Sequence, residues 1–192
     1  MQTATHTLPI GKTFKLSCKE GMLVGRETGK QVFENCLAFL GTQDKGALVE
    51  LDFSGVRFVD FSSADEFLGR LASRILSREL SDTCVLLTHC RPELCENIDA
   101  MLRLKSQAML CKGNDGKAEI LGRLHPQLAQ TLRFVEERKV VTARDLADAQ
   151  KIAINTSSNR LTKLGNLGLI GRREEPAVGK GGKQYRYFSL VA

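Results

Sequence analysis

The stretch LDFSGVRFVDFSSADEF, residues 51–67, contains the pattern that decides the fold of the first half of the chain. It begins inside an apolar run bounded by glycines, LVELDF at residues 48–53, which is typical of a buried strand. A turn and a second apolar stretch follow, and then Ser62 and Ser63 open a helical pattern. The order of strand, turn and helix raises the question of what the two serines do.

Helical and strand patterns alternate around this stretch. Apolar residues recur at helical spacing over residues 32–40 and 67–75, and Pro92 suits the first position of another helix. The run TCVLLT, residues 83–88, predicts a second buried strand, and two hairpins are expected, around Gly21 and over residues 107–121. Strands that alternate with helices predict an α/β fold with a mixed sheet.

The residues around the two serines favour a helix cap. Ser63 followed by Glu66 matches a capping box, and Ser62 with Asp65 offers the same arrangement one residue earlier. Acids in the first turn also stabilise the helix dipole. The pattern by itself therefore predicts a structural role for both hydroxyl groups.

The motif LDFSGVRFVDFSSADEFL also resembles the central strand, loop and helix of STAS domains, the fold of anti-sigma-factor antagonists. In those antagonists a serine at or next to the position after the aspartate is phosphorylated. Here the aspartate is Asp60 and Phe61 follows it, so the chain is closer to divergent STAS-like domains with a Ser-x-Ala-Asp-Glu motif. The resemblance covers residues 10–105 and implies a STAS-like domain with a protein partner, with Asp60, Ser62 and Ser63 as candidate regulatory residues.

Charge divides the chain into two parts. Residues 1–123 hold 16 Lys and Arg against 16 Asp and Glu, whereas residues 124–192 hold 12 against 6, which accounts for the whole net charge of +6. We therefore expect a first domain at 1–123 and a second at 124–192. A basic module beside a neutral one is typical of a protein that binds a polyanion.

The sequence also indicates where the protein is located and which kinds of chemistry it lacks. The N-terminus has no apolar signal region, no apolar run approaches the roughly 18 residues of a membrane span, and the six cysteines are scattered, so we expect a cytoplasmic protein that does not enter a membrane. No phosphate-binding loop or nucleophile motif is present, and we expect no enzyme, no cofactor and no metal. His89 and Cys90 with Cys95 lack a fourth zinc ligand at a suitable spacing.

The second half predicts three helices and a hairpin. A helix over residues 126–137 is followed by Thr142, which caps a second helix, and by a third helix over residues 156–164 that ends at Gly165. Leu161 and Leu164, three residues apart on this third helix, are expected to face the protein core. Two short strands around a basic, glycine-rich tip complete the order of a winged helix.

The stretch VTARDLADAQKIAINTSSNRLTKLGNLGLIGRR, residues 141–173, resembles the helix-turn-helix of MarR-type bacterial regulators, with Gln150 and Lys151 in place of the usual small residue in the turn. The resemblance covers residues 126–190 and implies an α+β winged helix-turn-helix that binds double-stranded DNA, as a homodimer on a two-fold site. The residues expected to contact DNA are Thr156, Ser157, Ser158, Asn159, Arg160, Lys163, Arg172, Arg173, Lys180 and Lys183.

Taken together, the sequence predicts a DNA-binding transcriptional regulator with a STAS-like domain for signal input or protein contact. One alternative is an anti-sigma-antagonist-like switch protein that binds a kinase-like partner and uses the winged helix for protein docking. A second alternative is an enzyme that acts on nucleic acid with a metal held by Asp52, Asp60 and Asp65.

Overall fold

A central five-stranded sheet organises the computed structural model, which describes residues 12–80, 83–113, 115–176 and 183–191. The strands are parallel except for the last, which is antiparallel to its neighbour. The strand order is β1 (Phe14–Lys15), β3 (Leu48–Asp52), β5 (Cys84–Thr88), β6 (Ala108–Lys112) and β7 (Ala118–Gly122). The predicted mixed α/β sheet is confirmed, as is the hairpin formed by β6 and β7.

One face of the sheet is covered by the helices of the first half. These are α1 (Arg26–Leu40), α2 (Phe61–Ala64), the π-helical segment Asp65–Gly69, α3 (Arg70–Leu76) and α4 (Pro92–Leu104). Their apolar residues join Val49, Leu51, Val85 and Leu87 of the sheet in one core cluster. Pro92 occupies the start of α4, as predicted.

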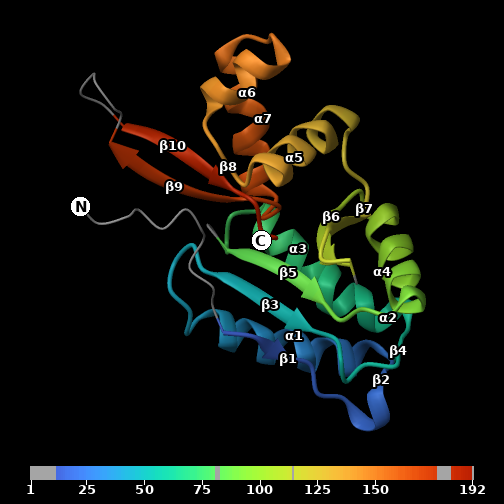
Figure 1. Cartoon of the computed structure of the whole chain (residues 1–192). Coiled ribbons are helices and arrows are strands. Elements are labelled where there is room, and N and C mark those ends of the chain that lie inside the picture. The colour runs from blue at the N-terminus through green and yellow to red at the C-terminus, as the bar shows by residue number, and fades with distance from the viewer. Residues whose placement is uncertain (1–11, 81–82, 114, 177–182, 192) are drawn as a thin grey trace.

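The C-terminal half covers the other face. It comprises α5 (Pro126–Arg138), β8 (Val140–Val141), α6 (Ala143–Gln150), α7 (Ile154–Asn166), β9 (Gly171–Pro176) and β10 (Lys183–Phe188). The strands form an antiparallel sheet in the order β8-β10-β9. Figure 1 shows these elements on the side of the five-stranded sheet opposite α1.

A single apolar cluster joins the two halves. Leu48, Leu86 and Leu110 point from the five-stranded sheet into a core that also contains residues of α5, α6, α7 and β10. At the same contact the Cys84 thiol donates to the Ile170 carbonyl, with Sγ and O 3.8 Å apart. The C-terminal half is therefore packed directly on the sheet, with its core continuous across residue 123.

The hairpin expected around Gly21 is wrong. Its first arm, β1, pairs in parallel with β3, and its second arm, β2 (Met22–Leu23), pairs in parallel with β4 (Phe58–Val59). Leu16 and Leu23 are both buried in the core, whereas an isolated two-stranded hairpin is only marginally stable in water. The two arms therefore separate and each joins a different partner.

The predicted serine cap is also wrong, because Asp60 caps α2. One carboxylate oxygen of Asp60 accepts from the Ser63 amide at 2.8 Å, and the other accepts from the Gly25 amide at 3.1 Å. Ser63 is fully buried, and its hydroxyl donates to the Leu23 carbonyl at 2.5 Å. Ser62 is half-buried. The aspartate fixes the start of α2, the start of α1 and strand β2 in one place.

No helix among the described residues has the length and apolar character needed to span a membrane.

We expect the substitution Asp60→Ala to lower the free energy of unfolding by about 1–2 kcal/mol, the upper part of the range for a lost N-cap, because two backbone amides lose their acceptor. Asp60→Asn keeps one acceptor oxygen and should cost less. Urea denaturation followed by far-ultraviolet circular dichroism measures both. Asp44→Ala, which removes an exposed carboxylate outside these contacts, is the control and should leave the stability unchanged. An Asp60→Ala protein as stable as the control would contradict the cap.

The same contacts set a pH dependence. Burial raises the pKa of Asp60, but the hydrogen bonds from Ser63 and the Gly25 amide outweigh it and hold this pKa below its usual value. Because the folded pKa is the lower one, the contribution is present above the unfolded pKa of about 3.9 and is lost as the pH falls through the folded value. The stability difference between wild type and Asp60→Ala should therefore shrink in acid.

The shared core predicts that the two halves unfold together. Both tyrosines, Tyr185 and Tyr187, lie on β10, and the chain has no tryptophan, so tyrosine fluorescence reports on the C-terminal half alone. We expect Leu86→Ala, although it lies in β5, to lower the tyrosine-monitored stability by about 2–5 kcal/mol. Circular dichroism should give the same midpoint. If Leu86→Ala leaves the midpoint of the tyrosine-monitored transition unchanged, the halves unfold separately. Glu34→Ala, at an exposed position, is the control.

Candidate nucleic-acid interface

Helix α6 begins at a capping box. The Thr142 hydroxyl accepts from the Asp145 amide at 3.2 Å, and the Asp145 carboxylate accepts from the Thr142 amide at 2.7 Å. Leu146 is fully buried beneath the helix. The prediction that Thr142 caps this helix is confirmed, and the cap fixes the helix that supports α7.

The turn after α6 uses a lysine in a left-handed conformation. Lys151 has φ 52° and ψ 45°, and its amide donates to the Ala147 carbonyl, as does the amide of Ile152 at 3.1 Å. Glycine is the usual residue at such a position, since a Cβ there costs roughly 1–2 kcal/mol. The turn thus keeps the geometry of a glycine turn in spite of the Lys151 side chain.

Helix α7 is longer than the sequence predicted. It begins at Ile154, two residues before Thr156, and ends at Asn166, so Gly165 lies within the helix and is not its cap. The left-handed residue is Gly168, with φ +69°. A Cβ on Gly168 would lie 3.0 Å from Ile75 of α3, so the chain turns where its backbone passes close to the first half. Leu161 and Leu164 are fully buried, as predicted.

Two of the predicted DNA contacts hold α7 against α6. Ser157 is fully buried, and its hydroxyl donates to the Ala143 carbonyl at 2.5 Å. The half-buried Arg160 donates from Nη1 to the Gln150 side chain at 3.1 Å. These contacts set the orientation of α7, and they leave the solvent-facing surface to other residues.

That surface carries Thr156, Asn159 and Lys163, which are exposed at positions i, i+3 and i+7. Within the described ranges their side chains make no hydrogen bond or ion pair, while Ser158 beside them is half-buried. In the part of the chain that the structure describes, no side chain caps the N-terminus of α7 at Ala153, so its first amides lack a side-chain acceptor there. Amide and ammonium groups in this arrangement suit base edges and phosphates.

The hairpin of β9 and β10 carries cations that already have neighbours. The guanidinium of Arg172 lies 5.7 Å from the centroid of the Tyr185 ring, and that of Arg173 lies 5.6 Å from the Phe188 ring. Lys183 pairs with Glu174 at 3.2 Å. Lys180 lies outside the described residues. The hairpin cations would therefore have to exchange these contacts for phosphates.

The sequence reading missed Tyr185 and Arg144. Tyr185 is 47% exposed on β10 and presents an aromatic ring beside Arg172, while Arg144 is exposed in the first turn of α6. The alternation in KQYRYF, residues 183–188, is the signal that places Tyr185 and Tyr187 on the same face of the hairpin. Tyr185 comes first along β10 and is exposed, whereas Tyr187, two residues later, is buried in the core.

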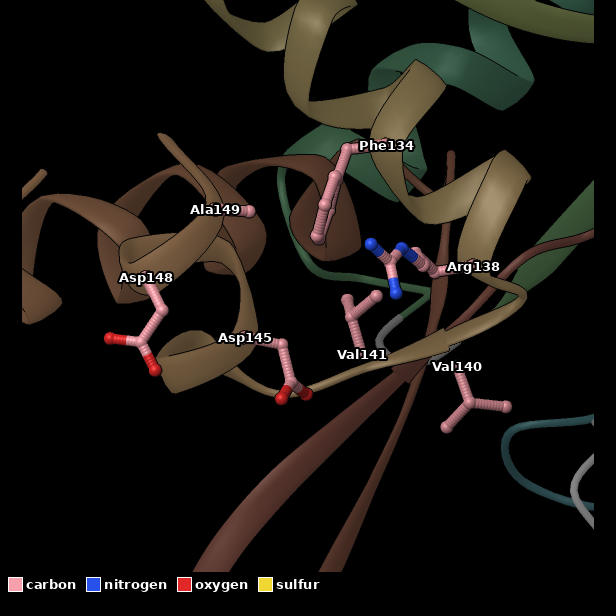
Figure 2. Close-up of a pocket in the computed structure, with 7 residues that line it drawn as sticks. All are labelled: Phe134, Arg138, Val140, Val141, Asp145, Asp148 and Ala149. Atoms are coloured by element: carbon pink, nitrogen blue, oxygen red, sulfur yellow. The ribbon is translucent and has the colours of Figure 1, made fainter. Parts of the chain in front are cut away.

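An open pocket of about 580 Å³ includes none of these exposed residues in its lining (Figure 2). It is lined by Phe134, Arg138, Val140, Val141, Asp145, Asp148 and Ala149 of α5, β8 and α6. Figure 2 shows the Arg138 guanidinium near the Phe134 ring, and its distance to the ring centroid is 5.7 Å. The carboxylates of Asp145 and Asp148 disfavour a phosphate backbone here, so we place the candidate interface on α7.

The three aspartates considered for a metal have separate roles. Asp60 caps α2, Asp52 pairs with Nδ1 of His89 at 2.9 Å, and Asp65 pairs with Lys105. They do not form part of any group of three or more metal-ligating side chains in the part of the chain that the structure describes. The geometry therefore offers no support for a catalytic metal at these residues.

Comparison with known proteins adds no assignment. No protein-family model matches the chain, and no curated protein matches it significantly.

The turn between α6 and α7 gives a direct test of backbone strain. Lys151→Gly should raise the free energy of unfolding by about 0.5–1 kcal/mol, since it removes the Cβ from a left-handed residue but adds freedom to the unfolded chain. Lys151→Ala removes the same charge and keeps the Cβ, so it should give no such gain. Urea denaturation of the two variants decides the matter, and equal stabilities would show that Lys151 is not strained.

Proposed function

We propose that the protein is a DNA-binding transcriptional regulator in which α6, α7 and the β9–β10 hairpin form a winged helix-turn-helix. The observation that carries the proposal is the set of exposed side chains Thr156, Asn159 and Lys163 on α7, which have no partners among the described residues. They lie on a helix whose orientation is fixed by Ser157 and Arg160. A polar face held rigidly and free of internal contacts is suited to the major groove.

The distribution of charge supports a polyanionic partner. The excess of +6 lies wholly in residues 124–192, and Arg144, Lys163 and Arg173 are exposed there. On this proposal Lys163 and Asn159 approach base edges, and Arg144 and the hairpin cations neutralise phosphates. A homodimer on a two-fold site would place two copies of α7 in successive grooves.

The first half is proposed to be STAS-like and to receive a signal or a protein partner in the cytoplasm. Apolar side chains are exposed along its paired strands β2 and β4, where Met22 (41% exposed) lies opposite Phe58 (42%). Val24, directly after β2, and Phe61, the first residue of α2, are also exposed. Exposed apolar groups that gather in this way are typical of contact surfaces between proteins.

The alternative of a phosphorylated anti-sigma-antagonist-like switch has weaker support. A kinase needs access to the hydroxyl group, but the Ser63 hydroxyl is buried and donates to the Leu23 carbonyl. Phosphorylation at Ser63 would therefore require α2 to separate from β2. Ser62 is half-buried and is the more accessible of the two serines.

Fluorescence anisotropy with labelled duplex DNA across a salt series tests the proposal on the full chain. We expect salt-sensitive binding, and Lys163→Ala should reduce the slope of log K against log salt by about 1 if this lysine contacts a phosphate, or relax sequence preference if it contacts a base. Asn159→Ala should weaken binding to a selected site by about 1–3 kcal/mol. Lys112→Ala, an exposed lysine on β6, is the matched control.

Absence of binding to random and selected duplexes at low salt would overturn the proposal. Equal binding by wild type and by the Asn159→Ala/Lys163→Ala protein would show that these residues of α7 do not contact DNA. Circular dichroism of each variant confirms that these exposed substitutions leave the fold intact.

A further inference from the structure

Three cysteines from separate elements meet at one end of the five-stranded sheet. Cys90 lies in the loop after β5, Cys95 lies in α4, and Cys111 lies near the end of β6. Their Sγ atoms all lie within 4.8 Å of one another, and those of Cys95 and Cys111 are 4.0 Å apart. No other group of three or more metal-ligating side chains is this close in the described ranges of the chain.

The topology explains why these residues meet. Strands β5 and β6 are parallel neighbours, so their carboxyl ends lie at the same edge of the sheet. The chain leaves β5 through His89, which adopts a left-handed conformation with φ 57°, and then enters α4 at Pro92. This tight connection returns Cys95 toward the end of β6, where Cys111 faces the helix-covered side.

A carboxylate lies near the three thiols, outside the group whose ligand atoms are within 4.8 Å of one another. Glu119 is the cross-strand partner of Cys111 in the β6–β7 hairpin, so both side chains lie on the same face. It is exposed, and its negative charge raises the pKa of Cys95 and opposes the lowering of that of Cys111, so it lies within electrostatic reach of both thiols. Three sulfur ligands and one oxygen ligand satisfy the coordination number that zinc takes in closed sites.

We propose that Cys90, Cys95, Cys111 and Glu119 form a binding site for a thiophilic divalent cation of the Zn²⁺ type. Zn–S bonds of about 2.3 Å in a tetrahedron place the sulfur atoms roughly 3.8 Å apart, which is close to the spacing already present. A disulfide would need the sulfur atoms at about 2.05 Å, so it requires a much larger displacement. The ion would tie β5, α4, β6 and β7 together at the edge of the sheet.

The three thiols shift one another's pKa. Hydrogen bonding to Cys111 and burial raise the pKa of Cys90, and burial raises that of Cys95 to about 12, while donation from Cys90 lowers the pKa of Cys111. A bound cation would stabilise all three thiolates, because metal ligation displaces the thiol protons.

The test uses the full chain purified under reducing conditions, with zinc quantified by elemental analysis and affinity measured by Co²⁺ titration. We expect one ion per chain and the charge-transfer absorption of cobalt–thiolate bonds. Cys95→Ser and Cys111→Ser should lose both signals. Cys18→Ser removes a half-buried thiol outside the cluster, and this control should bind as wild type does.

Glu119→Gln separates ligation from folding, because Glu119 is exposed and its substitution should leave the sheet intact. We expect it to keep the cobalt–thiolate absorption and to weaken affinity by about tenfold or more, as loss of even an outer-shell partner does. Wild-type protein that takes up no stoichiometric Zn²⁺ or Co²⁺ would overturn the proposal. So would metal uptake that Cys95→Ser and Cys111→Ser leave unchanged, or a Cys95–Cys111 disulfide in protein that binds no metal.

Discussion

The structure depends on a sheet that is apolar on both faces. Every residue of β5, from Cys84 to Thr88, is buried, so neither face of this central strand can be left to water. Helices α1 to α4 cover one face, and the C-terminal half covers the other. Parallel strands with both faces covered read as continuous apolar runs, which is the pattern of residues 83–88. The position of the proposed DNA-binding half thus follows from a requirement of the sheet.

On α7, neighbouring polar residues have different roles. Ser157 and Arg160 contact α6, whereas Thr156, Asn159 and Lys163 face solvent. The helical period separates the two sets, since residues one position apart differ by about 100° around the axis. A helix that must be held still and must also present polar groups therefore needs polar residues on more than one side.

Much of the architecture was predictable because apolar spacing reflects burial. The strands at 48–53 and 83–88, the hairpin at 107–121, the cap at Thr142 and the buried Leu161 and Leu164 follow from local patterns. Pairing between distant strands was not predictable, since β1 and β2 are too short to specify their partners. Asp60 was missed as a cap because Ser62 and Ser63 offered equally good local chemistry, and only burial of Ser63 separates them. The three cysteines became neighbours through topology, which spacing along the chain does not reveal.

The continuous core between the two halves also constrains how this protein can change over generations. If the C-terminal half were replaced by another domain, Leu48, Leu86 and Leu110 would be exposed unless the new domain packed against them equally well. A substitution in the core beneath α5 and α7 therefore favours a compensating substitution in the other half. Recombination at residue 123, where the charge composition changes, should therefore yield few chimaeras that fold.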